Sequence, residues 1–225
     1  MDIHLTSFPQ RAHDAKGTLV AIDVFRAFTT AAYAFAAGAS EIVVVKELDE
    51  ALALKASGRV ELTIGERHGL KPDGFDFGNS PTVLSEMGLD GARIAQTTTN
   101  GTACLAAAPE GTSLYAAALV NARATGKALR GAEQATILAA GRNGKTRADE
   151  DELCALYMRS VALNEPYDEG ALGDLLVRWF GTDEFLSGRE HLGPRTDWLL
   201  ALELDKFDFA IKVTREDGLL VARAG

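Results

Sequence analysis

The chain has 225 residues, of which 47% are hydrophobic and 24% charged, and its net charge is −9. This length suits one sizeable globular domain or two small lobes, and the acidity disfavours nucleic acid or an anionic membrane surface as a partner. Two cysteines without a C-x-x-C spacing disfavour structural zinc and a disulfide scaffold. Because there is no signal-peptide pattern and no apolar run of about 18 residues, we expect a cytoplasmic protein with no membrane partner.

Apolar segments alternate with alanine-rich ones in the first ninety residues. Strands are predicted at residues 18–23, 41–46 and 60–66, with helices at 26–39 and 48–58 between them. This β-α-β-α-β order predicts a parallel sheet with helices on its faces. A short helix at 80–88, with a serine to cap it and a proline at its first position, completes the segment.

The same pattern restarts after residue 90. Strands are expected at residues 92–99, 113–119 and 135–141, with helices at 100–111 and 121–131. The restart predicts one domain, residues 1–225, with two related sub-lobes at 18–90 and 91–225. The alternative is that two alanine-rich units align by composition alone. Two more helices are expected at 149–163 and 169–181, and a hairpin at 209–224 ends the chain.

Unusual polar residues fall where the predicted strands end. Asp23 and Arg26 follow the first strand, "GERHG" (65–69) ends the third, and "TTTNGT" (97–102) ends the first strand of the restarted pattern. Asn121 and "AAGRNGK" (139–145) follow the next two strands. Because ligands bind outside the carboxyl ends of parallel strands, these loops are expected to share one rim.

Each of these features has two interpretations. Asp23 is a metal ligand or a helix cap, and Arg26 and Arg67 clamp an anion with forked hydrogen bonds or form surface ion pairs. The loop at Gly101 and the helix start at 78–81 offer backbone N–H groups to an anion, or are ordinary turns. The acidic residues 149–152 are a solvated helix start or, together with Asp23, supply carboxylates to Mg²⁺.

Two classes of phosphatase do not fit the chain. The haloacid-dehalogenase pattern D-x-D-x-T needs a second acid where this chain has Phe25. A cysteine phosphatase needs C-x5-R, but Glu110 and Ser160 stand where the arginine would follow Cys104 and Cys154.

An ordered set of motifs resembles a known family. "IDVFRAFTT", "GER", "GFDFGNSP", "TTTNGT", "LVNARA" and "EDELCA" resemble the 2-phosphosulfolactate phosphatase (ComB-like) family, from about Val20 to Leu156. The resemblance implies a three-layer α/β/α fold with a mostly parallel mixed sheet. It also implies Mg²⁺-dependent hydrolysis of the phosphate ester of a small sulfonated acid in coenzyme M biosynthesis. Another phosphorylated hydroxy acid stays open as the substrate.

Together, the residues and the resemblance predict a site. The predicted catalytic residues are Asp23, Arg26, Glu66 and Arg67. The predicted substrate-binding residues are Asn79, Ser80, Thr98, Thr99, Asn100, Gly101, Thr102 and Asn121. The predicted Mg²⁺ ligands are Asp23, Glu150 and Asp151. Mg²⁺ would act as a Lewis acid on the phosphoryl group, the arginines would neutralise charge, and Glu66 would be the base for the attacking water.

Three alternatives stay open. Asp23 would be the nucleophile in a route through an aspartyl-phosphate, although the partner acid two residues on is missing. A non-catalytic sensor of an organic phosphate or sulfonate would use the same arginines, but it gains nothing from carboxylates in an anion pocket. An isomerase or lyase acting on a phosphorylated acid is the third. A homodimer is the expected assembly.

Overall fold

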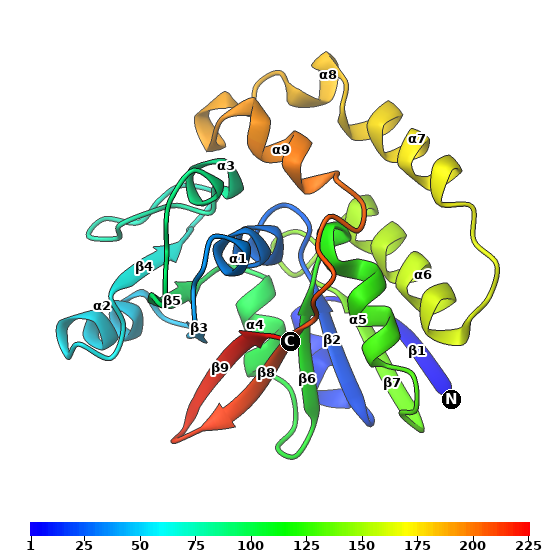
Figure 1. Cartoon of the computed structure of the whole chain (residues 1–225), viewed down its shortest axis with the longest axis horizontal. Helices are drawn as coiled ribbons and strands as arrows, with labels where there is room; N and C mark the ends of the chain where they lie inside the picture. The colour runs from blue at the N-terminus through cyan, green and yellow to red at the C-terminus, as the bar shows by residue number, and fades with distance from the viewer.

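The first predicted strand lies inside a nine-stranded sheet in the computed structural model, which describes residues 1–225 (Figure 1). Strand β2 (Thr18–Ile22) pairs in parallel with β6 (Ser113–Ala117) on one side and with β7 (Gln134–Ala139) on the other. Residues 19–22 are buried, which explains the continuous apolar run of this central strand. Strand β1 (Asp2–Ser7) adds a parallel edge to β7.

A second parallel group completes the sheet. Strand β5 (Arg93–Thr97) lies between β3 (Glu41–Val44) and β4 (Leu62–Gly65). The hairpin of β8 (Ile211–Glu216) and β9 (Leu219–Ala224) joins the two groups, because β8 pairs antiparallel with β6 and β9 pairs antiparallel with β3. The order is β1-β7-β2-β6-β8-β9-β3-β5-β4. The predicted three-layer α/β fold with a mostly parallel mixed sheet is confirmed.

Strands from the two halves of the sequence interleave. β2 belongs to the first half but lies between β6 and β7, and β5 belongs to the second half but lies between β3 and β4. Each half therefore places its first strand between the second and third strands of the other. The division into related sub-lobes at 18–90 and 91–225 stays a prediction.

The carboxyl ends of β2 and β5 meet, although the sheet is not parallel throughout. The hairpin reverses the direction of β3, β4 and β5 relative to β2. Five strand steps separate β2 from β5, and at roughly 20–25° per step the twist turns one strand about 100–125° relative to the other. Opposed strands then cross, and their ends converge: the N–H of Gly101 after β5 donates to Asp23 after β2 at 3.0 Å. The predicted single rim of a parallel sheet is therefore wrong. The loops come together because the strand ends of two oppositely directed parallel groups, β1-β7-β2-β6 and β3-β5-β4, converge.

Helices cover both faces of this sheet (Figure 1). The α-helices are α1 (Ala27–Ala36), α2 (Leu48–Ala56), α3 (Pro81–Ser85), α4 (Gly101–Ala106), α5 (Ala122–Ala128), α6 (Asp149–Leu163), α7 (Glu169–Phe180), α8 (Asp183–Leu186) and α9 (Arg195–Ala201). The 3-10 helices are η1 (Pro9–Asp14), η2 (Leu119–Asn121) and η3 (Glu190–Leu192). None of these helices combines the length and apolar character needed to span a membrane.

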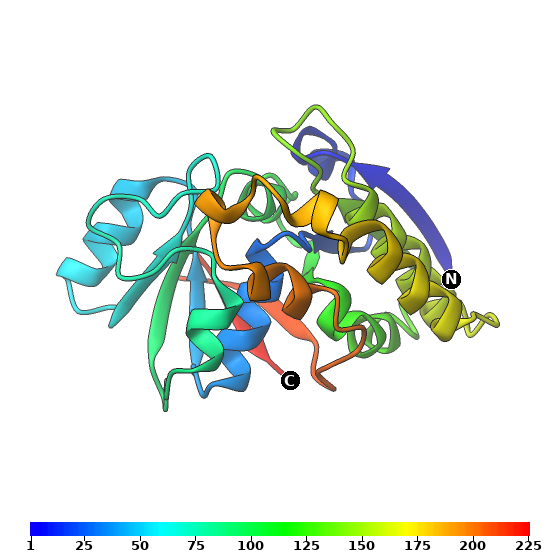
Figure 2. The same ribbon diagram turned by 90° about the horizontal axis from the view of Figure 1, so that it is seen from above.

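Two helical regions frame the site. Helix α6 begins with four acidic residues, which suit its positive dipole end, and it ends at Asn164 in the left-handed conformation (φ 57°). Helices α7 to α9 arch over α1 and α3 (Figures 1 and 2). This arch brings residues 180–198 next to the loop after β2, a contact that no local sequence pattern indicates. The N-terminal edge strand β1 was also not predicted, because its burial is irregular and it lacks an apolar run.

Candidate active site

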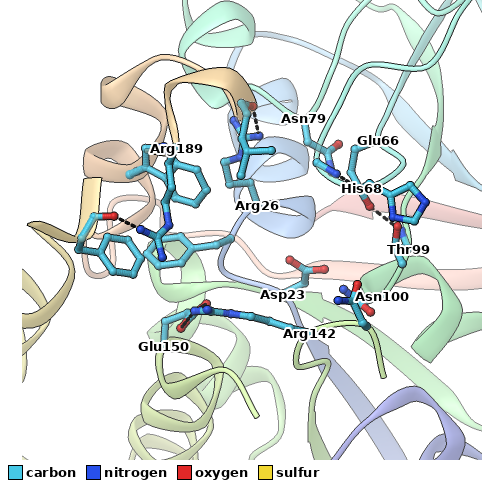
Figure 3. Close-up of a pocket in the computed structure, with 16 residues that line it drawn as sticks. Asp23, Arg26, Glu66, His68, Asn79, Thr99, Asn100, Arg142, Glu150 and Arg189 are labelled. Carbon is cyan, nitrogen blue, oxygen red and sulfur yellow. Dashed lines mark hydrogen bonds and ion pairs between the residues drawn. The ribbon is translucent and has the colours of Figure 1, made fainter. Parts of the chain in front are cut away.

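A cavity of about 420 Å³ opens where the loops after β2, β4, β5 and β7 meet (Figure 3). Charged side chains of both signs line it: Asp23, Glu66 and Glu150 with Arg26, Arg142 and Arg189. The remaining lining residues are Phe25, His68, Gly69, Asn79, Thr99, Asn100, Asn143, Phe185, Leu192 and Trp198. The cavity therefore combines anion-binding groups with groups that bind a cation or move a proton.

Asp23 is held at the floor of the cavity by backbone N–H groups. Its Oδ1 accepts from Ala27 at 3.1 Å, and its Oδ2 accepts from Gly101 at 3.0 Å. Burial raises the pKa of Asp23 to about 7, and the negative charges of Glu66 and Glu150 add to the rise. Asp23 was expected to be either a metal ligand or a helix cap. Its carboxylate accepts from the first residues of α1 and α4 and also lines the cavity, so the two interpretations are compatible.

Glu66 is held across the ends of β4 and β5. Its Oε1 accepts from the N–H of Thr99 at 2.6 Å, and its Oε2 accepts from the N–H of Gly69 at 2.7 Å. Each carboxylate oxygen has a second lone pair, so the group keeps acceptor capacity toward the cavity. Its orientation is set by backbone atoms rather than by flexible side chains.

Glu150 and Arg142 form the wall of the cavity beside α6. Arg142 Nη2 lies 3.3 Å from both carboxylate oxygens of Glu150. The side chain of Glu150 is 2% exposed whereas that of Arg142 is 49% exposed. Burial raises the pKa of Glu150, and the arginine partly offsets this effect. The half-exposed guanidinium is free to turn toward an anion in the cavity.

Arg26 enters the cavity wall with its charge already compensated. It forms an ion pair with the fully buried Asp197 of α9, donates to the carbonyl of Leu192, and stacks 4.9 Å from the ring centre of Trp198. Asp197 also accepts from Ser80 Oγ at 2.7 Å. Burial lowers the pKa of Arg26, and Asp197 opposes that shift. Arg26 thus fastens the arch of α7 to α9 to the cavity.

Two buried polar atoms of cavity residues have no hydrogen-bond partner. They are Asn79 Oδ1 and Thr99 Oγ1. A buried polar group without a partner is costly, so both atoms are suited to a bound ligand or water. Asn79 is only 4% exposed, and its free oxygen belongs to a class that hard cations accept.

The donor set fits Mg²⁺ in the form this ion commonly takes in phosphate enzymes. No group of three or more His, Cys, Asp or Glu side chains is close enough to hold a metal without help. Mg²⁺, however, is usually bound by one or two carboxylates together with waters and substrate phosphates. Asp23 and Glu150 are carboxylates of the same cavity that would serve in this way, and the unpartnered oxygen of Asn79 is a further oxygen that would accept the ion.

Asp151, the other predicted metal ligand, does not line the cavity. Its Oδ1 accepts from the N–H of Val24 at 2.8 Å, and its Oδ2 accepts from the N–H of Gly141 at 3.1 Å. It therefore ties the end of β2 to the end of β7. Burial, with the charges of Asp23 and Glu150, raises its pKa well above the usual range. Consecutive residues of α6 point in different directions, so Glu150 lines the cavity whereas Asp151 binds the backbone below its floor.

The side chains of three further predicted site residues are committed to the framework. The guanidinium of Arg67 donates to the carbonyls of Glu66 at 2.8 Å and Lys46 at 2.7 Å, so it joins strand ends and is not an anion clamp. Thr98 and Thr102 bind each other, with N–H to Oγ1 distances of 3.0 and 3.1 Å. Both threonines are buried and cap the turn rather than line the cavity.

Three more of the predicted substrate contacts do not line the cavity. The Ser80 hydroxyl accepts from the N–H of Val83 as the cap of α3, and it donates to Asp197. The N–H of Gly101 is used by Asp23 rather than by a ligand. Asn121 is fully buried and accepts from the N–H of Ala118 at 2.9 Å within its own turn. Of the eight predicted binding residues, Asn79, Thr99 and Asn100 line the cavity.

Sequence reasoning missed one whole side of the cavity. Arg142 lies in the "AAGRNGK" loop, which the pattern placed at the rim without assigning a residue. Phe185, Arg189, Leu192 and Trp198 come from the arch, beyond the segment from Val20 to Leu156 that carries the motifs, where "GREHLG" (188–193) is only a looser match. Only the tertiary contact with the loop after β2 shows their role.

Comparison with known proteins identifies the family. The family model described as 2-phosphosulpholactate phosphatase matches residues 5–179. Proteins named probable 2-phosphosulfolactate phosphatase include one from Cyanothece sp. that is 37% identical over 162 residues, 69% of this chain and 66% of its own. One from Carboxydothermus hydrogenoformans is 42% identical over 125 residues, 55% of this chain and 52% of its own. One from Bacillus subtilis is 30% identical over 206 residues, 88% of this chain and 87% of its own.

The chain spans between half and two thirds of the first two of these relatives. The cavity residues from Asp23 to Glu150 lie within the part that matches the family, whereas those from Phe185 to Trp198 lie beyond it. Because the match covers most of the chain and includes the carboxylates described above, the chain belongs to the 2-phosphosulpholactate phosphatase family.

Proposed function

We propose that this protein is a phosphoric monoester hydrolase that uses Mg²⁺ and acts on 2-phosphosulfolactate or a closely similar phosphorylated acid. One observation carries the proposal. Three carboxylates and three arginines line the same cavity, with two unpartnered polar atoms among them. Arginines alone would serve an anion binder, whereas carboxylates in an anion site serve a cation or a proton transfer. The names of the relatives support the choice of substrate.

Charge neutralisation is the first task of these residues. A phosphate monoester brings up to two negative charges into a cavity that already holds Asp23, Glu66 and Glu150. Arg142 is the phosphate-facing guanidinium in our scheme because its side chain is half exposed and its contact with Glu150 is long. A positive charge beside the phosphoryl group stabilises negative charge that develops in the transition state, commonly the largest catalytic contribution.

Asp23, Glu150 and the side-chain oxygen of Asn79 would hold the Mg²⁺. When bound, Mg²⁺ supplies Lewis-acid stabilisation to phosphoryl oxygens. The chain's own contribution is a carboxylate at Asp23 whose position is set by two backbone N–H groups. The hydroxyl of Thr99 and the amide of Asn100 would orient the phosphate on the opposite wall.

Glu66 is the proposed base for the attacking water. Its carboxylate is fixed by the N–H groups of Thr99 and Gly69, so it is oriented before substrate binds. It would take a proton from the water as the water oxygen bonds to phosphorus and the bond from phosphorus to the ester oxygen breaks, and the leaving alkoxide would then take up a proton, from Glu66 or from solvent, to give the alcohol. The route through an aspartyl-phosphate ranks second, because Phe25 stands where the second acid belongs and packs against Phe185 and Trp198.

Mutation of Glu66 tests this assignment. We expect Glu66→Gln to lower kcat for phosphate release by roughly 10²- to 10⁴-fold, the usual contribution of a general base. Glu86→Gln, which changes an exposed glutamate at the end of α3, is the matched control and should leave kcat unchanged. An unaltered kcat in Glu66→Gln would remove Glu66 from the mechanism. A hydroxylamine-sensitive phosphoryl group trapped on Asp23 by rapid quench would select the covalent route instead.

Three further expectations stay predictions. They are the place of the reaction in coenzyme M biosynthesis, the cytoplasmic location, and the homodimer.

A further inference from the structure

Arg189 differs from the other two arginines of the cavity because it has no ion-pair partner. It lies in the turn between α8 and η3, and its guanidinium carbon is 4.0 Å from the ring centre of Phe185. One of its N–H groups donates to the carbonyl of Phe185. No carboxylate lies within 4.0 Å of its guanidinium, since none of the ion pairs of the chain includes it.

The other two cavity arginines are compensated. Arg26 is paired with the buried Asp197, and Arg142 is paired with Glu150. Arg189 is therefore the one guanidinium of the cavity whose positive charge has no carboxylate partner. An uncompensated cation facing a cavity is a natural partner for an anionic group of a ligand.

The guanidinium keeps most of its donors available. Its flat face is covered by Phe185, and the Phe185 carbonyl takes one N–H. Of the five N–H groups of an arginine, those on the remaining edges are free to form a forked contact with an oxyanion. Stacking on an aromatic ring also limits the orientations of the side chain.

The surroundings strengthen such a contact. Phe25 packs 5.7 Å from Phe185 and 5.2 Å from Trp198, measured between ring centres. These three rings make an aromatic wall beside Arg189. Removing water from around a charge pair lowers the local dielectric and increases its attraction. The wall also suits a weakly hydrated oxyanion better than it suits a metal ion.

Arg189 lies across the cavity from Thr99 and Asn100, which are assigned to the phosphate. In Figure 3 it is on one side, Thr99 and Asn100 are on the other, and Asp23 is between them. The unpartnered oxygens of Asn79 and Thr99 are on the side away from Arg189. A ligand that spans the cavity would thus meet Arg189 with the end that does not react.

We propose that Arg189 is the specificity-determining residue that binds the second, non-reacting oxyanion of the substrate, a sulfonate or a carboxylate, while the phosphate lies at the Asp23 side. This inference rests on the proposed phosphatase function and assigns a role to a residue beyond the part that matches the family. It explains why the cavity extends to the arch, because a simple phosphate ester would not need that side.

Steady-state kinetics on four esters test the inference. The esters are 2-phosphosulfolactate, 2-phospholactate, which lacks the sulfonate, 2-phosphooxyethanesulfonate, which lacks the carboxylate, and ethyl phosphate, which lacks both. We expect Arg189→Met to raise KM for 2-phosphosulfolactate by roughly ten- to a hundredfold, the loss of a charge-assisted contact, with little change in kcat. Ethyl phosphate should show no such rise. 2-Phospholactate and 2-phosphooxyethanesulfonate each carry one non-reacting oxyanion. The one whose KM rises in Arg189→Met identifies the oxyanion that Arg189 binds.

Two further variants separate binding from folding. Arg189→Lys keeps the charge but loses the fork, so its KM should lie between those of the wild type and Arg189→Met. Arg195→Met is the matched control: it removes an arginine of the same arch that pairs with Asp183 at 2.6 Å and does not line the cavity. Its KM values should equal those of the wild type. An equal rise for all four esters in Arg189→Met, or no rise for any, would overturn the inference.

Calorimetric binding of sulfolactate distinguishes failure of this inference from failure of the proposed function. Sulfolactate carries both non-reacting oxyanions and no phosphate, so its binding does not depend on hydrolysis. We expect it to bind the wild type and to bind Arg189→Met roughly tenfold or more weakly. If none of the esters is hydrolysed, the proposed function fails while this comparison still decides the role of Arg189. If hydrolysis occurs but Arg189→Met binds sulfolactate as the wild type does, only the inference fails.

Discussion

Replacing Asp23 by asparagine is expected to change how the free energy of unfolding depends on pH. Burial raises the pKa of Asp23 from 3.8 to about 7, with added contributions from the charges of Glu66 and Glu150. In the unfolded chain the carboxyl group loses its proton near pH 4, whereas in the folded chain it keeps the proton until about pH 7. Between these values the folded state binds more protons, so stability falls as pH rises.

The size of the effect follows from the shift. Each pKa unit corresponds to about 1.36 kcal/mol, so a shift of about three units lowers the free energy of unfolding by about 4 kcal/mol between pH 4 and pH 8. The asparagine side chain of the variant would not ionise, and its amide would lose one of the two N–H contacts from Ala27 and Gly101, at a cost of about 1–3 kcal/mol. The variant should therefore be less stable than the wild type at pH 4 and more stable at pH 8.

Urea unfolding of the wild type and Asp23→Asn at pH 4 to 8, in the presence of EDTA, measures this change in the order of their stabilities. Asp73→Asn, which removes an exposed carboxylate, controls for the loss of charge. A constant stability difference between Asp23→Asn and the wild type across this range would refute the argument that burial raises the pKa of Asp23. At pH 8, Mg²⁺ at ten times its Kd for the wild type should restore about 1.4 kcal/mol to the wild type and less to the variant, because the variant lacks one of the two carboxylates that would hold the ion.

Three other substitutions have defined outcomes. Asp197→Ala leaves the buried Arg26 without its partner and should lower the free energy of unfolding by about 3–5 kcal/mol in urea; a loss below about 1 kcal/mol would show that the pair does not hold the arch. Gly101→Ala places a Cβ 2.8 Å from Asp23 Oδ2, so kcat should fall roughly ten- to a hundredfold, and an unchanged kcat would show that the position of Asp23 is not critical. Arg67→Met should lower stability but leave KM unchanged, because Arg67 binds strand ends; a raised KM would return it to the anion site.

Local patterns predicted most of the elements and the part of the site that lies on strand ends. Buried apolar runs and alanine-rich helices have clear periodicities, and parallel strands place their following loops together. Asp23 and Glu66 were found in this way, Glu150 was found from the acidic run at the start of α6, and all three line the cavity. The order of strands was not predictable, because interleaving of the halves depends on long-range pairing that leaves no local signal.

The errors at the site have a common physical origin. Arg67 and Asp151 have the residue types that a phosphate or metal site needs, but in the fold their polar atoms satisfy backbone groups at strand ends. A sequence gives the type of a side chain and not its hydrogen-bond partners. Arg189 was missed for the opposite reason, since it reaches the cavity only because the arch packs its aromatic residues against Phe25.

Release of inorganic phosphate from 2-phosphosulfolactate, measured with Mg²⁺ and with EDTA, tests the proposed phosphatase activity most directly. We expect turnover that requires Mg²⁺ and that is lost in Asp23→Ala, because Asp23 is a carboxylate of the cavity that would hold the ion. Phosphate release that is equally fast in EDTA would contradict the role of Mg²⁺. No release from this or any other phosphorylated hydroxy acid, with the ligand still bound, would contradict the claim that the cavity is an active site.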